Sequence, residues 1–326
     1  KILLPQNVSN LIAQNAYVFV LATGMLLCIL TGGNIDLSVG SIVCFVGAVG
    51  GICMVTKEMG TGISILAMLL VGIVYGSILG FIIAYMNIPP WIATLAGYLA
   101  FRGWATALLS ANSSTGSIAP FPKSYLSIFS GKIFETAIGV FNVPCMVIGV
   151  VAGAVVIAVM IMGRKNRVKK GYEVESMAAM IAKMVIAVAV ILLFSYKLAL
   201  SGGLPTVLLW VVAVVLVYQF ITSKTTIGRY FYTIGGNREA TRLSGIDTKK
   251  IMFMAYLNMA VLTVISAFTV VARFQAANAT AGTNFEMDAI SACVVGGVSA
   301  YGGSGTVFGM VVGATLIGVI NLGMSL

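Results

Sequence analysis

Nine apolar stretches, most of them long enough to cross a lipid bilayer, dominate this sequence. They span residues 11–30, 42–55, 63–86, 91–110, 145–163, 177–200, 206–222, 251–272 and 289–322. A helix needs about 20 apolar residues to cross the hydrocarbon core. Only 9% of the 326 residues are charged, against about 25% in soluble domains. We therefore predict an all-α fold over residues 1–326, a polytopic transmembrane helical bundle with eight or nine crossings and some broken or re-entrant helices.

The residue types that usually bind metals or act as general bases are scarce. Histidine is absent, and five cysteines lie in or beside apolar runs without metal-ligand spacing: Cys28, Cys44, Cys53, Cys145 and Cys293. We interpret them as small buried hydrophobic residues. No catalytic residue and no metal site is predicted. The 37 glycines are expected to let helix backbones approach one another closely.

Basic residues gather in two connections between apolar runs, and the formal net charge is +10. One cluster is Arg164, Lys165, Arg167, Lys169 and Lys170, and the other is Lys224, Arg229, Arg238, Arg242, Lys249 and Lys250. Loops rich in Lys and Arg stay on the cytoplasmic side of the membrane. We predict cytoplasmic loops at 164–177 and 223–250, a membrane-lipid environment and no nucleic-acid partner.

The alternation of crossings assigns sides to the remaining loops. Five apolar runs precede the first basic cluster, so the polar stretch 111–143 is predicted to be extracytoplasmic and the first residue to lie outside as well. Residues 1–10 read as a loop, and we expect a further helix upstream of them. The alternative is that 42–55 is re-entrant; we favour the upstream helix.

A polar break joins the first two apolar runs. Residues 31–41 contain Asn34, Asp36 and Ser38 together with three glycines. A charge at bilayer depth costs at least about 2.5 kcal/mol, and non-helical backbone there has to face protein or a water-filled cavity. We expect these side chains to border a translocation path. A compatible structural interpretation is that Asn34 or Asp36 caps the helix that starts near Leu37.

A second break, at residues 282–288, precedes another run of small residues that ends in a glycine pair. Asp288 and Ser291 are the side chains that we assign to the same path. The predicted topology puts the two breaks at opposite ends of their crossings. An inverted repeat has this arrangement and binds substrate near the midplane. Chance similarity between glycine-rich apolar segments is the alternative.

The second basic loop contains a candidate docking element. Asn237 is placed to cap a short helix that runs to Leu243, and Gly245 is placed to end it. The other residues assigned to this element are Gly235, Gly236, Glu239, Ala240 and Arg242. A plain basic connector is the alternative interpretation. In the apolar runs, Arg102 and Arg273 are further candidates for a pore-facing position.

Three motifs together resemble permease subunits of ABC sugar importers of the ribose, xylose and galactose type. They are Gly33-Asn34-Ile35-Asp36-Leu37-Ser38-Val39-Gly40-Ser41, then Gly235-Gly236-Asn237 with Ala240, Leu243, Ser244, Gly245 and Ile246, and Asp288-Ala289-Ile290 through Gly296-Gly297. Asn34 is an extra residue relative to the usual Gly-Gly-Ile-Asp. The basic loop with Gly171-Tyr172-Glu173-Val174-Glu175 looks most like the xylose or multiple-monosaccharide branch.

The resemblance implies a function and a set of partners. It implies a multi-pass permease of the bacterial cytoplasmic membrane that pairs with a second permease copy as a homodimer. An extracytoplasmic binding protein would deliver a monosaccharide, and a separate ATPase subunit would bind ATP and Mg. The sequence contains no Gly-x-x-x-x-Gly-Lys-Ser/Thr phosphate loop. The segment 235–245 would then couple this chain to the ATPase.

Other classes of transporter stay open at this point. In an ion-coupled carrier or channel, Asp36, Glu286 and Asp288 would bind a cation or a proton. Branched relatives of the importer family carry nucleosides. A membrane enzyme is disfavoured because histidine is absent and no nucleophile–base pair is evident.

Overall fold

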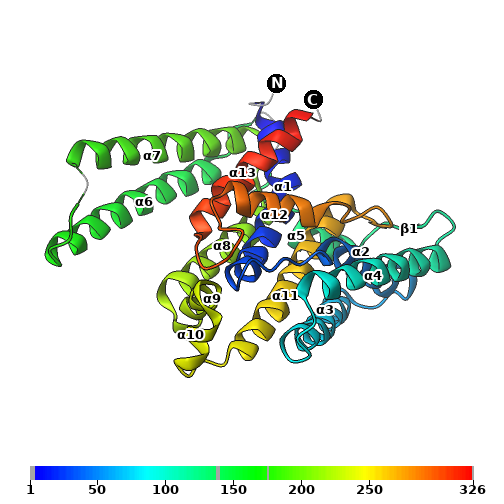
Figure 1. Cartoon of the computed structure of the whole chain (residues 1–326). Helices are drawn as coiled ribbons and strands as arrows, with labels where there is room; N and C mark the ends of the chain where they lie inside the picture. The colour runs from blue at the N-terminus through cyan, green and yellow to red at the C-terminus, as the bar shows by residue number, and fades with distance from the viewer. Residues whose placement is uncertain (1–3, 137–139, 175, 325–326) are drawn as a thin grey trace. The chain divides into compact units, whose positions relative to one another are not determined.

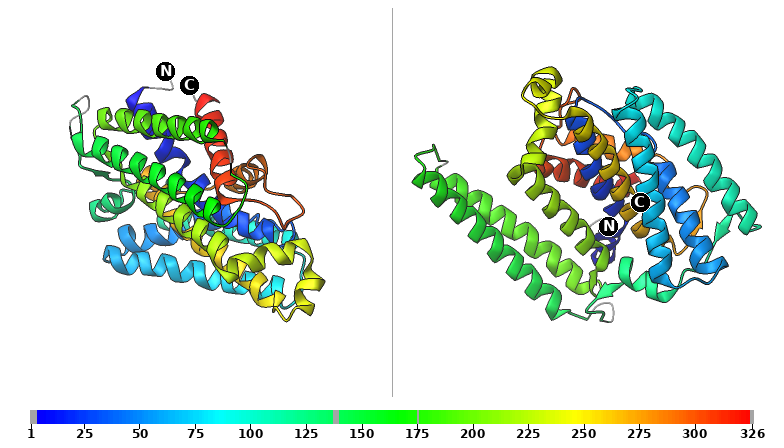
Figure 2. Two further views of the ribbon diagram at one scale, coloured as in Figure 1. Left: turned by 90° about the vertical axis from the view of Figure 1, so that its left-hand side faces the viewer. Right: turned by 90° about the horizontal axis from the view of Figure 1, so that it is seen from below.

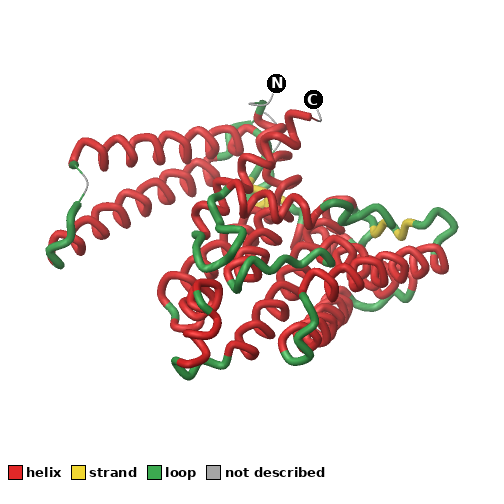
Figure 3. Tube along the Cα trace, viewed as in Figure 1, coloured by secondary structure: helices red, strands yellow, loops and turns green. Residues whose placement is uncertain are grey.

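The computed structural model describes residues 4–136, 140–174 and 176–324. Glu175, part of the basic-loop motif, lies outside the described residues. Helices make up most of the described chain (Figure 3). The chain divides into two compact units, a small unit of residues 1–12 and 132–205 and a large unit of residues 13–131 and 206–326.

The large unit holds most of the helices (Figure 1). Its first half contains most of α1 (Pro5–Leu30), then α2 (Val39–Gly51) with a π-helical turn (Ile52–Thr56), α3 (Thr61–Ala84), α4 (Pro90–Asn112) and α5 (Lys123–Phe129). Its second half contains α8 (Thr206–Lys224), α9 (Thr226–Gly236), α10 (Arg238–Leu243), α11 (Thr248–Phe274), α12 (Phe285–Val295) and α13 (Val307–Met324).

The small unit is a helical hairpin. It is built from α6 (Val143–Lys169) and α7 (Met177–Leu200), which run side by side in both views of Figure 2. The strands β2 (Lys132–Ile133) and β3 (Leu204–Pro205) pair antiparallel beside it, with Lys132 opposite Pro205. A Cβ on Gly149 of α6 would lie 2.0 Å from Ser195 Oγ of α7, so the missing side chain lets the two helices approach closely.

Nine helical segments in the described residues are long and apolar enough to cross a membrane. They correspond to the predicted runs, with the last run broken into α12 and α13. Apolar side chains such as Leu99, Val185 and Phe220 are more than half exposed. Surfaces of this kind suit lipid or a partner subunit, because water would not solvate them. The predicted all-α polytopic bundle is confirmed.

The predicted loops contain more helix than expected. α6 continues through the first basic cluster to Lys169, because Lys and Arg favour helix and stabilise its carboxyl end. The segment 223–250 contains α9 and α10. The segment 111–143 contains α5 and the strands β1 (Ser117–Ile118) and β2, and β1 pairs antiparallel with β4 (Ala277–Asn278).

The core of the large unit is formed by α1, α2 and α11, which are mostly buried. α3 packs closely against α11 through its glycines. A Cβ on Gly76 would lie 2.5 Å from the Cβ of Ala260, and one on Gly72 would lie 2.1 Å from Val264 Cγ2. This contact of small residues is the expected way to bring two helices together in lipid, where van der Waals packing replaces the hydrophobic effect.

The two ends of α11 define two ends of the large unit. The α10 end contains α10 and the start of α11, and the β1–β4 end contains the strand pair that follows Phe274. α1 finishes at the α10 end, where the Leu30 carbonyl accepts a hydrogen bond from Gly303 at 3.1 Å. Near the end of α2, Gly51 packs on Ile118 and Ala277. The chain between the end of α1 and the end of the π-helical turn therefore runs from one end of the unit to the other. This favours a membrane crossing by residues 42–55 over the re-entrant alternative.

We predict that Gly76→Ala destabilises the protein and that Gly62→Ala, in the same helix, does not. The added methyl group at position 76 has to displace the Cβ of Ala260, whereas a Cβ at position 62 meets nothing within 4 Å. Overpacking of this kind costs roughly 1–3 kcal/mol. The measurement is the thermal unfolding midpoint of each purified variant in the same detergent. Equal midpoints for the two variants would contradict the α3–α11 contact.

Candidate functional site

Inside the large unit, the first turn of α2 packs against the loop just before α12. A Cβ on Gly40 would lie 2.0 Å from the Gly282 carbonyl oxygen, and a Cβ on Gly282 would lie 2.0 Å from the Gly40 carbonyl oxygen. Gly282 also has φ +75°, in the left-handed region that favours glycine. Neither glycine can be replaced without moving backbone, so the two helix amino termini are held together by direct main-chain contact.

The elements around this contact have an inverted arrangement. α1 and α11 are antiparallel, because Gly24 faces Met259 while Cys28 faces Ala255. α1 and α11 finish at opposite ends of the unit. Each of them is followed by a break, and each break leads into a shorter helix. The shorter helix then packs on the other long helix: Gly47 of α2 faces Val271, and Cys293 of α12 donates to the Ala22 carbonyl at 3.2 Å. This geometry is that of an inverted repeat, one of the two interpretations that the sequence leaves open.

Asp36 closes the first break by a local turn. Its Oδ1 accepts hydrogen bonds from the Ser38 N–H, at 2.9 Å, and from the Ser38 hydroxyl. Both residues are fully buried or nearly so. α2 begins at Val39, and Ser38 occupies the N-cap position without a side-chain cap hydrogen bond. Asp36 thus fixes the backbone one residue before the helix, and does not bond to its first turn as a helix cap does.

Asn34 has a different role from the predicted cap. Its amide donates to the carbonyl and the hydroxyl of Thr31, both at 3.2 Å, and lies 3.6 Å from Met252 Sδ. It therefore satisfies acceptors at the carboxyl end of α1 and leaves the first turn of α2 alone. Sequence spacing alone does not separate these two possibilities, because an amide in a short loop reaches either helix end.

Arg102 holds the second break. Its Nη1 donates to the carbonyls of Ala279 and Ala281, at 3.2 and 2.8 Å. These two residues lie in the loop that leads into α12. In the described residues, the other terminal nitrogen of Arg102 is buried without a hydrogen-bond partner. The guanidinium thus spans from α4 to the backbone of the break, which is a positioning contact that the sequence does not reveal.

Glu286 is the most deeply buried acid near the junction after Asp36. Its side chain is 5% exposed, and its Oε2 lies 2.6 Å from the position that a Cβ on Gly40 would take. Among the described residues this oxygen has no hydrogen-bond partner. A buried polar atom without a partner costs free energy, so the junction is a place where water, a proton or a polar ligand would be stabilised.

The other two predicted path residues lie further along α12. Asp288 Oδ2 accepts a hydrogen bond from the Tyr17 hydroxyl of α1 at 2.5 Å. Ser291 is half-buried. Among the described residues no hydrogen bond joins either of them to Asn34, Asp36 or Ser38, so the predicted path residues form two separate groups. Sequence reasoning missed Tyr17 because one tyrosine in an apolar run carries no signal of its own.

The candidate docking element forms as predicted. The Asn237 side chain caps α10 by accepting from the Ala240 N–H at 2.9 Å, and Gly245 has φ +84° after the helix ends. Glu239 and Arg242 form an ion pair with each other at 3.0 Å. Ala240 is exposed and Leu243 is 82% exposed, so both side chains stay available for a partner.

α9 connects α10 to the first break. A Cβ on Gly235 would lie 1.9 Å from the Leu30 carbonyl oxygen and 2.4 Å from the Gly303 nitrogen. The Tyr232 hydroxyl donates to the Gly305 carbonyl at 3.0 Å. The turn that contains Gly303 and Gly305 also meets the first break, since a Cβ on Gly33 would lie 2.2 Å from the Ala300 carbonyl oxygen. Main-chain contacts without intervening side chains therefore lead from the exposed helix to the break that contains Asp36.

The chain matches the family model described as "Branched-chain amino acid transport system / permease component" over residues 7–326. It belongs to this family of permease components. It is 33% identical to the xylose transport system permease protein of Haemophilus influenzae, over 98% of this chain and 82% of that protein. The Escherichia coli K12 xylose permease is 32% identical, over 98% of this chain and 79% of that protein. No solved structure matches.

A third relative is the ribose import permease protein of Escherichia coli K12, which is 30% identical over 98% of this chain and 78% of that protein. The predicted family is confirmed. The chain is a multi-pass protein of the bacterial inner membrane and a transport component, not an enzyme. In the described residues, no group of three or more metal-ligating side chains is placed to hold a metal ion.

We predict that Asp36→Asn supports transport and that Asp36→Leu abolishes it. Asparagine keeps the oxygen that accepts from Ser38 and removes only the charge. Leucine leaves the buried Ser38 N–H without its acceptor, which costs about 1–3 kcal/mol. Solute uptake and the thermal unfolding midpoint are measured for both variants. Ser38→Ala is the matched control, because it removes the hydroxyl and keeps the N–H. Normal uptake by the leucine variant would show that the turn is dispensable.

Proposed function

We propose that this chain is the membrane-spanning permease subunit of an ATP-driven importer for a monosaccharide, xylose or a related pentose or hexose. The observation that carries the proposal is the 33% identity to a xylose permease over 98% of this chain. The junction of α2 and α12 also supports it, because paired half-helices are a common way to build a substrate path through a bilayer.

The proposed importer needs three partners. A separate ATPase subunit binds ATP and Mg, since the chain contains no phosphate loop of the Gly-x-x-x-x-Gly-Lys-Ser/Thr type. A binding protein delivers the sugar from the side of the 111–143 segment, and a second copy of this chain completes a homodimer. The 164–177 and 223–250 segments then face the cytoplasm, as their basic residues favour.

α10 is the element through which we propose that the ATPase moves the permease. Nucleotide chemistry takes place outside the membrane, so its motion has to enter through a cytoplasmic surface. α10 is capped at Asn237 and leaves Ala240 and Leu243 exposed. Packing of these two side chains in a cleft of the partner would contribute about 25 cal/mol per Å² of apolar area buried. The contacts of Gly235 with Leu30 and Gly303 carry displacement from α10 to the break at Asp36.

An ion-coupled carrier is the second candidate, and the unpartnered Oε2 of buried Glu286 favours it. The two functions are separated by D-xylose uptake into vesicles that contain this chain, the ATPase and the binding protein. We expect uptake that requires ATP, and loss of uptake when the ATPase is left out. Uptake that persists without the ATPase and follows an ion gradient would favour the carrier and contradict the importer.

We predict that Ala240→Lys uncouples the importer and that Ala240→Ser does not. Both substitutions keep the backbone N–H that Asn237 accepts from, so α10 forms in both. Lysine places a long charged side chain on the surface that packs against the ATPase. In the lysine variant, ATP hydrolysis should no longer respond to sugar-loaded binding protein, although the permease still inserts. Intact assembly together with sugar-stimulated hydrolysis in this variant would remove α10 as the coupling element.

A further inference from the structure

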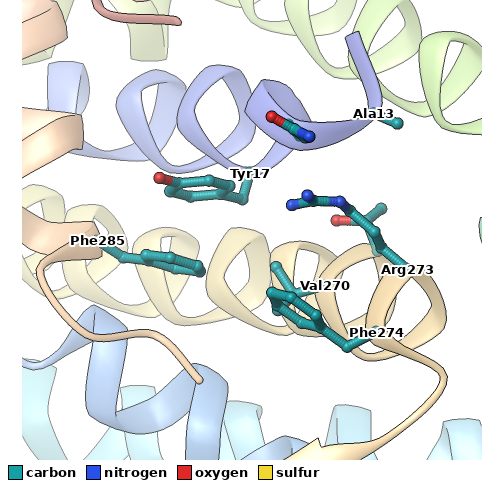
Figure 4. Close-up of a pocket in the computed structure, with 8 residues that line it drawn as sticks. Ala13, Tyr17, Val270, Arg273, Phe274 and Phe285 are labelled. Carbon is teal, nitrogen blue, oxygen red and sulfur yellow. The ribbon is translucent and has the colours of Figure 1, made fainter. Parts of the chain in front are cut away.

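A small cavity lies between α1, α11 and α12 in the large unit, and Tyr17 is one of the residues that line it. Figure 4 shows Arg273 reaching from α11 toward Tyr17 of α1, with the ring of Phe285 below Tyr17. Gln14 and Phe274 also line the cavity. Its volume is about 10 Å³, which is room for no more than one water molecule. The site is therefore closed in this structure.

Two polar side chains of this cavity make no hydrogen bond or ion pair with the described residues. Arg273 is half-buried and its contact is with the ring of Phe274, 5.2 Å from the ring centroid. Within the described residues, neither its guanidinium nor the half-buried amide of Gln14 makes a hydrogen bond or an ion pair. Half-buried polar groups without hydrogen-bond partners favour either water or a ligand.

Aromatic rings form the other wall. The rings of Tyr17 and Phe285 stack with their centroids 3.7 Å apart and their planes 16° from parallel. The Tyr17 hydroxyl donates to Asp288 at 2.5 Å, so the ring is held in place from α12. The faces of aromatic rings are electron-rich and attract the weakly positive C–H groups on the face of a sugar ring.

We propose that Gln14, Tyr17 and Arg273, with Asp288 holding Tyr17 in place, form a binding site for the ring of a neutral monosaccharide on its way into the membrane. This inference rests on the proposed function and extends it. Arg273 and the Gln14 amide supply donors for ring and hydroxyl oxygens, and Tyr17 supplies a stacking face. Asp288 orients Tyr17 by accepting the hydrogen bond of its hydroxyl. One cation and one acid give no net formal charge, which suits a polyol better than an anion.

Phe285 keeps this site closed. Its ring lies on Tyr17 in the place that a sugar ring would take. Phe285 is the first residue of α12 and follows Asn284, which has φ +64°. The loop before it is held by Arg102 and Gly40. The ring of Phe285 therefore has to leave Tyr17 before a sugar ring can stack there.

The test uses the complete complex of permease, ATPase and binding protein in vesicles, with D-xylose as the probe. Arg273→Gln and Gln14→Leu remove groups that have no hydrogen-bond partner in the described chain, so neither should unfold it. Co-purification of the ATPase checks assembly. Lys123→Gln, an exposed lysine on α5, is the matched charge control. Uptake and ATP hydrolysis stimulated by loaded binding protein are measured on the same vesicles.

We expect Arg273→Gln to lower D-xylose uptake at least tenfold while stimulated ATP hydrolysis stays within twofold of the wild type. Gln14→Leu should likewise lower the amount of D-xylose taken up per ATP hydrolysed, and Lys123→Gln should leave this ratio unchanged. An unaltered ratio in Arg273→Gln would overturn the site and leave the importer intact. A loss that disappears in vesicles of neutral lipid would assign Arg273 to an anionic headgroup instead, which also overturns the site. Wild-type vesicles without ATP-driven uptake would contradict the proposed function itself.

Discussion

The contact between Gly40 and Gly282 is the interaction on which the other parts of the site depend. Lipid offers no hydrogen bonds, so backbone that leaves a helix inside the membrane has to be enclosed by protein. Two breaks that face each other enclose one another, and glycine lets their main chains approach to a distance that any side chain would prevent. The turn of Asp36 on Ser38 and the hold of Arg102 on Ala279 and Ala281 then fix each break from its own side.

This construction concentrates polar groups where two helix amino termini meet. Glu286 is buried beside Gly40, and its Oε2 has no hydrogen-bond partner in the part of the chain that the structure describes. Asp36 lies in the turn just before α2. Such groups keep the junction from packing as a plain apolar core, because each of them needs a polar partner. A path for a hydroxyl-rich solute also needs polar groups at this place. Asp36 and Glu286 would equally serve an ion-coupled mechanism, and transport assays decide between the two.

In the proposed importer, movement of the ATPase reaches this junction through the α10 end of the unit. α10 itself is exposed, whereas α9 touches the carboxyl end of α1 and the turn at Gly303 through main-chain atoms. Contacts between backbones have little freedom to adapt, which is the physical basis on which we propose α10 as the coupling element. The stacked rings of Phe285 and Tyr17 close the cavity beside Arg273.

The sequence by itself determined the helical membrane fold, the positions of the spans and the capped helix that begins after Asn237. These features follow from local composition: apolar length sets a span, and an asparagine followed by a short polar helix and a glycine sets a cap. It also located both breaks, because acids and amides inside apolar runs are costly. Only the tertiary structure decided that Asn34 bonds back to Thr31, that Asp288 bonds to Tyr17, and that Gly40 meets Gly282. Those contacts depend on how the helices pack. The hydrophobic pattern of one helix does not determine its distance from another.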